Sequence, residues 1–182
     1  QKTTLVKLYI QIDETVHFYG LYTAFEPIDK KFIERRFDDI ETNGNLYKSL
    51  WQQFGPASLQ NNYPNLAIGI RDVDTNYRPT YDLKTNKKTN DTSDLVDFIS
   101  QINTLNQEDF QTYIETHFDI DRFIRLLAVG VLLGNPDDYR AMGNNYYLYN
   151  LPTSNVWTMI PYDYDHGLAQ GWDGSPVFSN WT

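Results

Sequence analysis

The first quarter of the chain carries patterns typical of strands. Apolar side chains occupy every second position from Val6 to Ile12, and a second strand-like run extends from Phe18 to Phe25 after a polar turn. The two runs predict a β-hairpin. Apolar residues then recur at helical spacing between Ile28 and Ile33, which predicts a short amphipathic helix. The turn Asn43-Gly44 precedes Leu46–Leu50, a predicted third strand.

The pattern becomes helical beyond residue 90. Between Gly55 and Asn90 the sequence is rich in Asn, Pro, Thr, Tyr and Lys with one apolar patch, and we interpret this segment as an irregular insertion. Three helices follow, because apolar side chains recur at spacings of three and four behind capping residues. They begin at Thr92-Ser93, at Asn106, and at Asp119 or Asp121. We expect these helices to form one bundle.

A second hairpin is predicted after the most apolar helix. Two short apolar runs, Tyr146–Tyr149 and Val156–Ile160, flank a polar turn. The order of elements predicts an α+β chain. Its β-rich N-terminal part would cover residues 1–90 with the insertion, and its helical C-terminal part would cover residues 91–182 with this hairpin.

Composition excludes several classes of function. The 182 residues include 15 Lys and Arg against 24 Asp and Glu, for a formal net charge of −9, and no clustered basic face is visible. Nucleic-acid and anionic-membrane binding are therefore disfavoured. No apolar run is long enough to span a membrane. The absence of cysteine excludes thiol catalysis and disulfides. Two Asn-x-Thr triplets, at Asn90 and Asn180, favour a secreted or surface-associated protein.

Acidic and amide side chains gather at both ends of the second hairpin. Asn145 precedes its first strand, Asp163 and Asp165 follow its second, and Asp137 lies in the loop before it. A hairpin returns the chain on itself, so Asn145 should approach Asp163. Oxygen ligands of this kind suit Mg²⁺, Mn²⁺ or Ca²⁺, and a further carboxylate would complete the set that phosphoryl transfer requires. Asp and Asn are also ordinary turn residues, so each of these motifs taken alone is equally consistent with a solvated turn.

The same residues resemble the spore coat protein H (CotH) kinase family. Five motifs match in family order: Gly20-Leu21-Tyr22-x-x-x-Glu26, Gly44-x-Leu46-Tyr47-Lys48, Asn135-x-Asp137-x-Tyr139, Asn145-Tyr146-Tyr147-Leu148-Tyr149 and Ile160-Pro161-Tyr162-Asp163-Tyr164-Asp165. The resemblance implies an atypical protein-kinase-like fold, with a small β-rich lobe and a larger helical lobe. It implies ATP-dependent phosphorylation of protein Ser/Thr with Mg²⁺ or Mn²⁺, and Ca²⁺ as an alternative. It also implies a family domain that extends beyond Gln1 and Thr182.

The resemblance assigns roles to individual residues. Asp137 matches the catalytic Asp, and Asn145 and Asp163 match the metal ligands, with Asp165 as a weaker further ligand. Lys48 is the candidate for contacting ATP phosphates, and Glu26 is a second candidate for cofactor binding. Lys48 is equally consistent with a surface lysine whose stem lies along apolar neighbours. No glycine-rich phosphate loop is visible, and the loop from Asp137 to Asn145 is longer than in ordinary protein kinases.

Two other functions remain open from the sequence. A catalytically silent surface, adhesion or structural module would keep the fold without the chemistry. A carbohydrate-active enzyme would also need paired carboxylates and aromatic residues. For a kinase, the net charge of −9 favours a protein substrate with a basic, Ser-bearing segment. The oligomeric state stays open.

Overall fold

The computed structural model describes residues 1–60, 65–168 and 170. The chain divides into two compact units, Gln1–Asp39 and Ile40–Thr182. Both helices and strands are present, so the fold is mixed α+β as expected. Within the described part, none of the helices is long and apolar enough to cross a membrane.

The first unit contains the predicted hairpin and short helix. Strands β1 (Thr3–Ile12) and β2 (Thr15–Phe25) pair antiparallel around a two-residue turn, and helix α1 (Lys30–Glu34) follows. The second strand therefore begins three residues before the run that predicted it. Asp29 caps α1, because its side chain accepts a hydrogen bond from the backbone N–H of Phe32.

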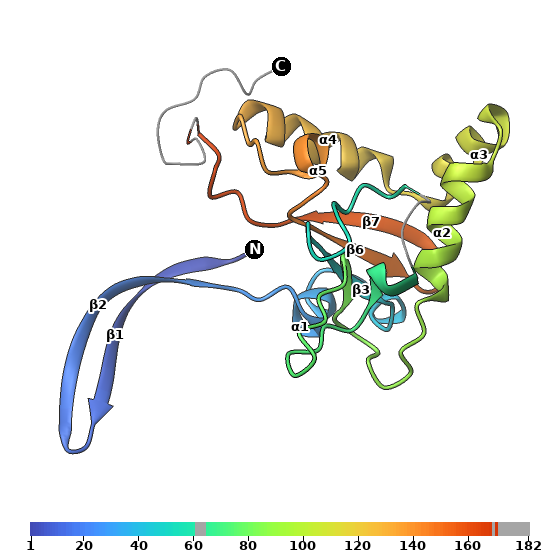
Figure 1. Ribbon diagram of the computed structural model, residues 1–182. Helices are drawn as coiled ribbons and strands as arrows, with labels where there is room; N and C mark the ends of the chain where they lie inside the picture. The colour runs from blue at the N-terminus through green and yellow to red at the C-terminus, as the bar shows by residue number, and fades with distance from the viewer. Residues whose placement is uncertain (61–64, 169, 171–182) are drawn as a thin grey trace. The chain divides into compact units, whose positions relative to one another are not determined.

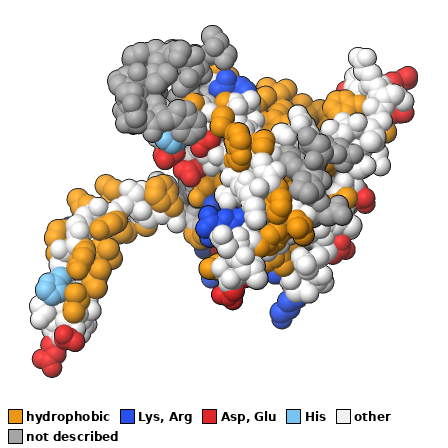
Figure 2. Space-filling view, in the orientation of Figure 1, with side chains coloured by type: hydrophobic (Ala, Val, Ile, Leu, Met, Phe, Trp, Pro, Cys, Tyr) orange, Lys and Arg blue, Asp and Glu red, His pale blue; other side chains and the backbone are white. Residues whose placement is uncertain are grey.

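Hydrophobic side chains on both faces of the β1–β2 hairpin are exposed. Figure 2 shows those on the face turned to the viewer. Leu5 and Tyr9 point to one face of β1, and Ile10 and Ile12 point to the other. The exposed fractions of Leu5 and Phe25 reach 73% and 63%. The alternation of apolar and polar residues correctly predicted where the strands lie. It also predicted that one face of the hairpin is buried, but in the described part of the chain both faces are exposed.

The second unit is built on a five-stranded sheet with the order β4-β5-β3-β6-β7. Figure 1 labels β3, β6 and β7 of this sheet. Its strands are β3 (Leu46–Ser49), β4 (Ile68–Gly69), β5 (Tyr81–Leu83), β6 (Tyr146–Leu151) and β7 (Val156–Pro161). All neighbours are antiparallel except β4 and β5. Strand β3 pairs with β5 on one side and with β6 on the other, so one sheet takes strands from both sides of residue 90.

The prediction of an irregular insertion between residues 55 and 90 is wrong, because two strands of this sheet lie there. Strands β4 and β5 both lie in that segment, and Tyr81 and Leu83 of β5 are fully buried. These strands span two and three residues, which is too short to give the alternation by which strands are recognised. Their strand conformation depends on pairing with distant residues and therefore leaves no local signal.

Four α-helices and two short 3₁₀ helices complete the second unit in the described residues. These are η1 (Asp39–Glu41), η2 (Asn65–Ala67), α2 (Ser93–Thr104), α3 (Gln107–His117), α4 (Ile120–Leu132) and α5 (Tyr139–Met142). The predicted cap at Asn106 is confirmed, since its side chain accepts from the N–H groups of Glu108 and Asp109. Of the alternatives Asp119 and Asp121, Asp119 caps α4 by accepting from the N–H of Arg122. Thr92 is the N-cap residue of α2, but its side chain makes no capping hydrogen bond.

The helices pack on the sheet rather than in the single bundle that we expected. Helices α2 and α3 contact each other, while α3 and α4 contact β7 (Figure 1). Trp157 of β7 is 2% exposed, and its ring centroid lies 5.1 Å from that of Phe98 on α2. Nearly all of β6 is buried. This apolar sheet holds each helix in place and leaves the start of β6 and the end of β7 to carry the polar residues.

Candidate functional site

The β6–β7 hairpin brings Asn145 and Asp163 to the same end of the sheet. Tyr146 pairs with Pro161, and the N–H of Tyr162 donates to the carbonyl of Asn145 at 3.1 Å. Asn145 therefore lies opposite the residue that directly precedes Asp163. Asn145 and Asp163 have φ angles of +54° and +55°. This left-handed conformation is uncommon outside glycine, and Asn and Asp adopt it more readily than other side chains.

Two amides hold the carboxylate of Asp137. Asn144 Nδ2 donates to its Oδ1 at 2.8 Å, and Asn145 Nδ2 donates to its Oδ2 at 2.7 Å. Asn145 Nδ2 also lies 3.0 Å from the Asp137 carbonyl oxygen. The backbone N–H of Asp137 donates to Oδ1 of Asn135. The side chain is thereby fixed in direction, and it is only half-buried.

The neighbouring Asp138 serves a different purpose. Asp138 is 1% exposed, and its Oδ1 caps α5 by accepting from the N–H of Ala141. Its Oδ2 faces Gly130 of α4 so closely that a Cβ there would clash with it. Of the two consecutive carboxylates, only Asp137 is open to a substrate.

Asp163 lies within a cluster of charges. Burial raises the pKa of Asp163, and the negative charges of Asp165 and Asp137 raise it further, while Lys48 and His166 act to lower it. Asp165 is exposed, with its Oδ1 3.9 Å from Nε2 of His166. Three carboxylates that act on one another in this way repel, and a bound cation would relieve the repulsion.

The oxygen donors around Asp163 are of the kind that a divalent cation binds. The Nδ2 group of Asn145 is engaged with Asp137, which leaves its Oδ1 as the end of the amide that can hold a metal. Asp163 and Asp165 would add carboxylate oxygens. In the described part of the chain, no group of three or more His, Asp or Glu side chains is arranged to hold an ion. The Asn145 amide, water and phosphate oxygens would therefore have to complete the coordination of the ion. Mg²⁺ commonly keeps several waters and phosphate oxygens beside one or two carboxylates.

Lys48 faces the same region from β3. Its Nζ lies 4.2 Å from the ring centroid of Tyr162 and 6.0 Å from that of Tyr147, a cation–π arrangement that positions the ammonium group. Lys48 also lines a cavity of about 120 Å³. Three further basic residues line this basic cavity: Arg71, Arg78 and Lys84.

The carboxylate of Asp82 organises the basic cavity. Asp82 is 6% exposed on β5, opposite Lys48 of β3. Its Oδ2 lies 2.8 Å from Nζ of Lys84, and its Oδ1 accepts from the backbone N–H of Arg71. Four cations against one carboxylate leave a local positive excess in a chain whose net charge is −9.

Sequence reasoning missed several of these residues. Arg71, Arg78 and Lys84 fell in the segment interpreted as irregular, and only the pairing of β5 with β3 brings them to Lys48. Asn144 directly precedes the predicted Asn145. The pair of consecutive Asn residues was therefore the one sequence feature that could have indicated its role beside Asp137.

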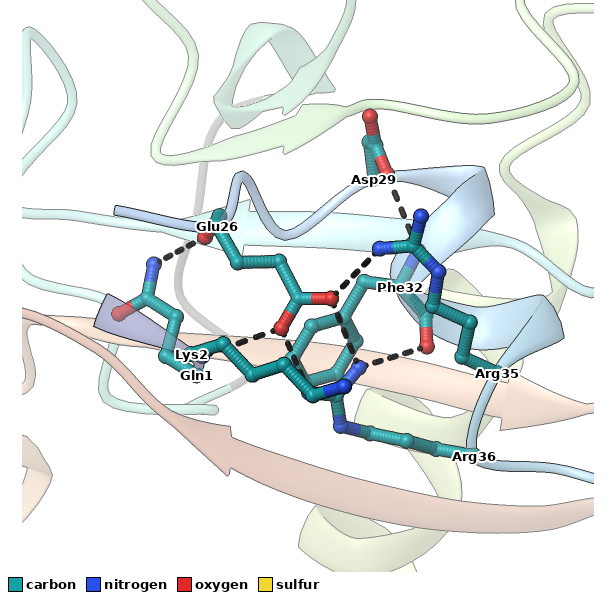
Figure 3. A network of polar contacts seen from close by, with 7 residues as sticks. All are labelled: Gln1, Lys2, Glu26, Asp29, Phe32, Arg35 and Arg36. Carbon is teal, nitrogen blue, oxygen red and sulfur yellow. Dashed lines mark hydrogen bonds and ion pairs between the residues drawn. The ribbon is translucent and has the colours of Figure 1, made fainter. Parts of the chain in front are cut away.

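Glu26 has all its contacts within the first unit (Figure 3). Its two oxygens lie 2.9 Å from Nη1 of Arg35 and 2.6 Å from Nη2 of Arg36, and the N–H of Lys2 donates to it as well. The hydrogen bond from Arg36 is the main cause that lowers the pKa of Glu26 to about 2. These ion pairs engage both oxygens, so they give no support to the cofactor-binding role predicted for Glu26, which stays a prediction.

Comparison with known proteins agrees with the motifs in this site. The model of the family described as CotH kinase protein matches residues 1–182. The chain is also 32% identical over 146 residues to the inner spore coat protein H of Bacillus subtilis (strain 168), an alignment that covers 80% of this chain and 36% of that protein. The chain thus spans about a third of the length of this curated relative. The family model covers the whole chain, and the chain therefore belongs to the CotH kinase protein family.

Proposed function

We propose that this domain is an ATP- and divalent-metal-dependent protein Ser/Thr kinase. One observation carries the proposal: the carboxylate of Asp137 is held by Asn144 and Asn145 at the hairpin end that also presents Asp163. Phosphoryl transfer needs a carboxylate to orient a hydroxyl, beside oxygen ligands for a metal on the phosphates. In this proposal Asp137 would be that carboxylate, and Asn145 and Asp163 would be those ligands.

Asp137 would act on the acceptor hydroxyl. Each of its oxygens accepts one amide N–H and keeps a lone pair for a further proton. The two amides fix the direction of that lone pair before the substrate arrives. Asp137 would accept the proton of the Ser or Thr hydroxyl as that oxygen attacks the terminal phosphate.

Asn145, Asp163 and Asp165 would hold Mg²⁺ or Mn²⁺, and Lys48 would contact the phosphates. The ion would neutralise phosphate charge when bound. Lys48 lies beside this cluster, since its charge already lowers the pKa of Asp163. Arg71, Arg78 and Lys84 extend the positive charge beyond Lys48, which suits the several charges of a triphosphate.

A protein substrate with a basic, Ser-bearing segment fits the charge of the site. Asp137, Asp163 and Asp165 give the acceptor side a negative field, and the whole chain carries −9. Opposite charge speeds encounter, and like charge suppresses the wrong partners. The relative named as an inner spore coat protein supports association of this domain with a coat or surface.

A second candidate is a catalytically silent structural module of the same family. The exposed apolar side chains on both faces of the β1–β2 hairpin favour it, because such surfaces commonly mark interaction sites. Such a module would bind a partner through the hairpin and would need neither nucleotide nor metal.

Thermal melting with ATP and metal distinguishes the two candidates. A ligand that binds only the folded state stabilises it, by about 2.7 kcal/mol at a concentration of about 100 Kd. A kinase should melt higher with ATP and Mn²⁺ together than the two separate effects predict. An Asp163→Asn variant serves as the control that lacks a metal ligand. Unchanged melting at millimolar ATP and Mn²⁺ would contradict the kinase and favour the silent module.

A further inference from the structure

A second cavity lies beside the loop that carries Asp137. It has a volume of about 370 Å³ and opens to solvent. Its walls are mainly apolar or aromatic, with Trp51, Pro56, Tyr139 and Met142 among them, and Arg140 is also part of the lining. Trp51 is 50% exposed, which is unusual for a side chain of its size. The volume is in the range of pockets that receive small ligands or large side chains.

This apolar pocket is separate from the basic cavity. Leu50 and Gln52 line the basic cavity, whereas Trp51 between them lines the apolar pocket. The segment 50–52 therefore forms a wall with one cavity on each side. A group in the apolar pocket would lie across this wall from the phosphates that the basic cavity is proposed to receive.

The apolar pocket is connected to Asp137 by a single amide. The backbone N–H of Trp51 donates to Oδ1 of Asn144 at 2.8 Å, and Nδ2 of the same side chain donates to Oδ1 of Asp137 at 2.8 Å. The opposite wall, Tyr139 to Met142, is helix α5, which begins two residues after Asp137 and is capped by Asp138. Both walls are thus fixed relative to the carboxylate that would orient the acceptor hydroxyl.

We infer that the apolar pocket binds an apolar or aromatic side chain of the acceptor polypeptide, a few residues from its Ser or Thr. This inference rests on the proposed function. The occupant belongs to the acceptor because the pocket is linked to Asp137 through Asn144, whereas Lys48 lines the other cavity. Trp51 and Tyr139 offer rings for packing, and Met142 offers an adaptable thioether. Arg140, whose Nε lies 3.8 Å from Oδ2 of Asp138, also lines the pocket.

The substrate class follows from both features of the site. The negative field around Asp137 and Asp163 favours basic residues near the acceptor hydroxyl, and the apolar pocket selects one large apolar side chain among them. The acceptor would be a basic Ser- or Thr-bearing segment with a Phe, Leu or similar residue at one fixed distance.

A peptide series tests this inference with the whole domain. One Phe is moved through every position on either side of the Ser in a basic peptide whose other positions are constant, and a Gly series is the reference. Phe at one or two positions should lower the KM for peptide by about tenfold, as expected for burying one large side chain. The substitution Trp51→Ala keeps the backbone N–H that binds Asn144, and it should abolish the Phe preference without changing the KM for ATP.

Two further variants make the result specific. Met142→Ala should weaken the same Phe preference, whereas Ile124→Ala, at a 58% exposed position on α4 outside the pocket, should preserve it. A preference that survives Trp51→Ala, or the lack of any preferred position, would overturn the inference. A rise in the KM for ATP with an unchanged KM for peptide would assign the pocket to the nucleobase and overturn it as well.

Equilibrium binding separates failure of this inference from failure of the proposed function. If the wild-type domain transfers phosphate to no peptide, the kinase proposal fails. The binding of the same fluorescently labelled peptides, measured by polarisation without ATP, then decides the pocket. Phe-dependent binding that Trp51→Ala abolishes would support a peptide pocket, and binding that is indifferent to Phe would reject it.

Discussion

Asn145 donates its side-chain N–H to Oδ2 of Asp137 at 2.7 Å, so one residue, directly before β6, both orients the candidate base and lies at the hairpin end that carries Asp163. The left-handed backbone of Asn145 directs its amide back towards the Asp137 loop. The hydrogen bond ties the positions of these two side chains together. If they act as proposed, positioning of the acceptor would be coupled to binding of the metal.

Replacing Asn144 or Asn145 by Ala should have different effects on the metal dependence of activity. Asn144→Ala removes one orienting hydrogen bond from Asp137 and should lower kcat by about tenfold without changing the metal concentration that gives half-maximal activity. Asn145→Ala removes an orienting bond and a metal ligand, so it should also raise that concentration, by about 10- to 100-fold. Activity titrated with Mn²⁺ measures both effects. Equal Mn²⁺ dependence in the two variants would contradict the metal role of Asn145.

Asp163→Asn should stabilise the metal-free protein at neutral pH. The pKa of Asp163 lies above its ordinary value in the folded state, so ionisation costs stability as the pH rises from below 3.8 through the folded pKa. The Asn variant lacks this cost, and its melting temperature in EDTA should exceed that of the wild type at pH 7. The difference should vanish below about pH 3.8, where both side chains are neutral. A variant that melts lower at pH 7 would rule out charge repulsion at this site.

Glu26→Gln should weaken the first unit in a pH-dependent manner. Arg36 and Arg35 lower the pKa of Glu26 to about 2 from 4.5, so its stabilisation is present above pH 4.5 and is lost as the pH falls through about 2. At pH 7 the variant should show faster hydrogen exchange in α1 than the wild type. The gap should narrow between pH 4.5 and about 2. Glu34→Gln, at an exposed position on α1, is the matched control and should leave α1 unchanged.

Gly130→Ala should destabilise the protein although Ala favours helices. Ala is preferred over Gly inside a helix by about 1 kcal/mol. At Gly130, however, the added Cβ would meet the buried Oδ2 of Asp138. Displacing a buried, helix-capping carboxylate should cost about 1–3 kcal/mol and lower the melting temperature. A melting temperature above that of the wild type would show that Asp138 can move without loss, and that the loop is less rigid than we describe.

Local sequence signals predicted the elements whose stability is local. Asn106 and Asp119 predicted the starts of α3 and α4, because a capping side chain binds backbone N–H groups in the first turn of its own helix. The alternation of apolar and polar residues up to Ile12 predicted β1, which is also a signal within one element. Strand β5 has no such signal, since Tyr81–Leu83 becomes a strand through its pairing with β3 and β4. The basic cavity depends on that pairing. Of the basic residues that line it, only Lys48 was therefore predicted from the sequence to contact phosphate.

The candidate site was predictable as far as its motifs lie close together in the chain. Asn145 and Asp163 flank one hairpin, so their approach followed from the hairpin itself. The contact of Trp51 with Asn144 joins residues 93 positions apart, and no spacing rule reaches that far. The choice between Asp137 and Asp138 was made on family resemblance alone, because two adjacent carboxylates look alike in the sequence and the burial of Asp138 depends on its packing against Gly130 of α4.

Transfer of labelled phosphate from ATP to a basic Ser peptide, compared between wild type and Asp137→Asn, tests the central claim most directly. In Mn²⁺ the wild type should label the peptide on Ser. Asp137→Asn should lose about 10²- to 10⁴-fold in rate, the usual contribution of a positioned base, while it keeps its stabilisation by ATP and Mn²⁺. Asp121→Asn, which removes an exposed acid of α4, should label the peptide like the wild type. Wild-type labelling by Asp137→Asn, or no labelling by the wild type, would contradict the account.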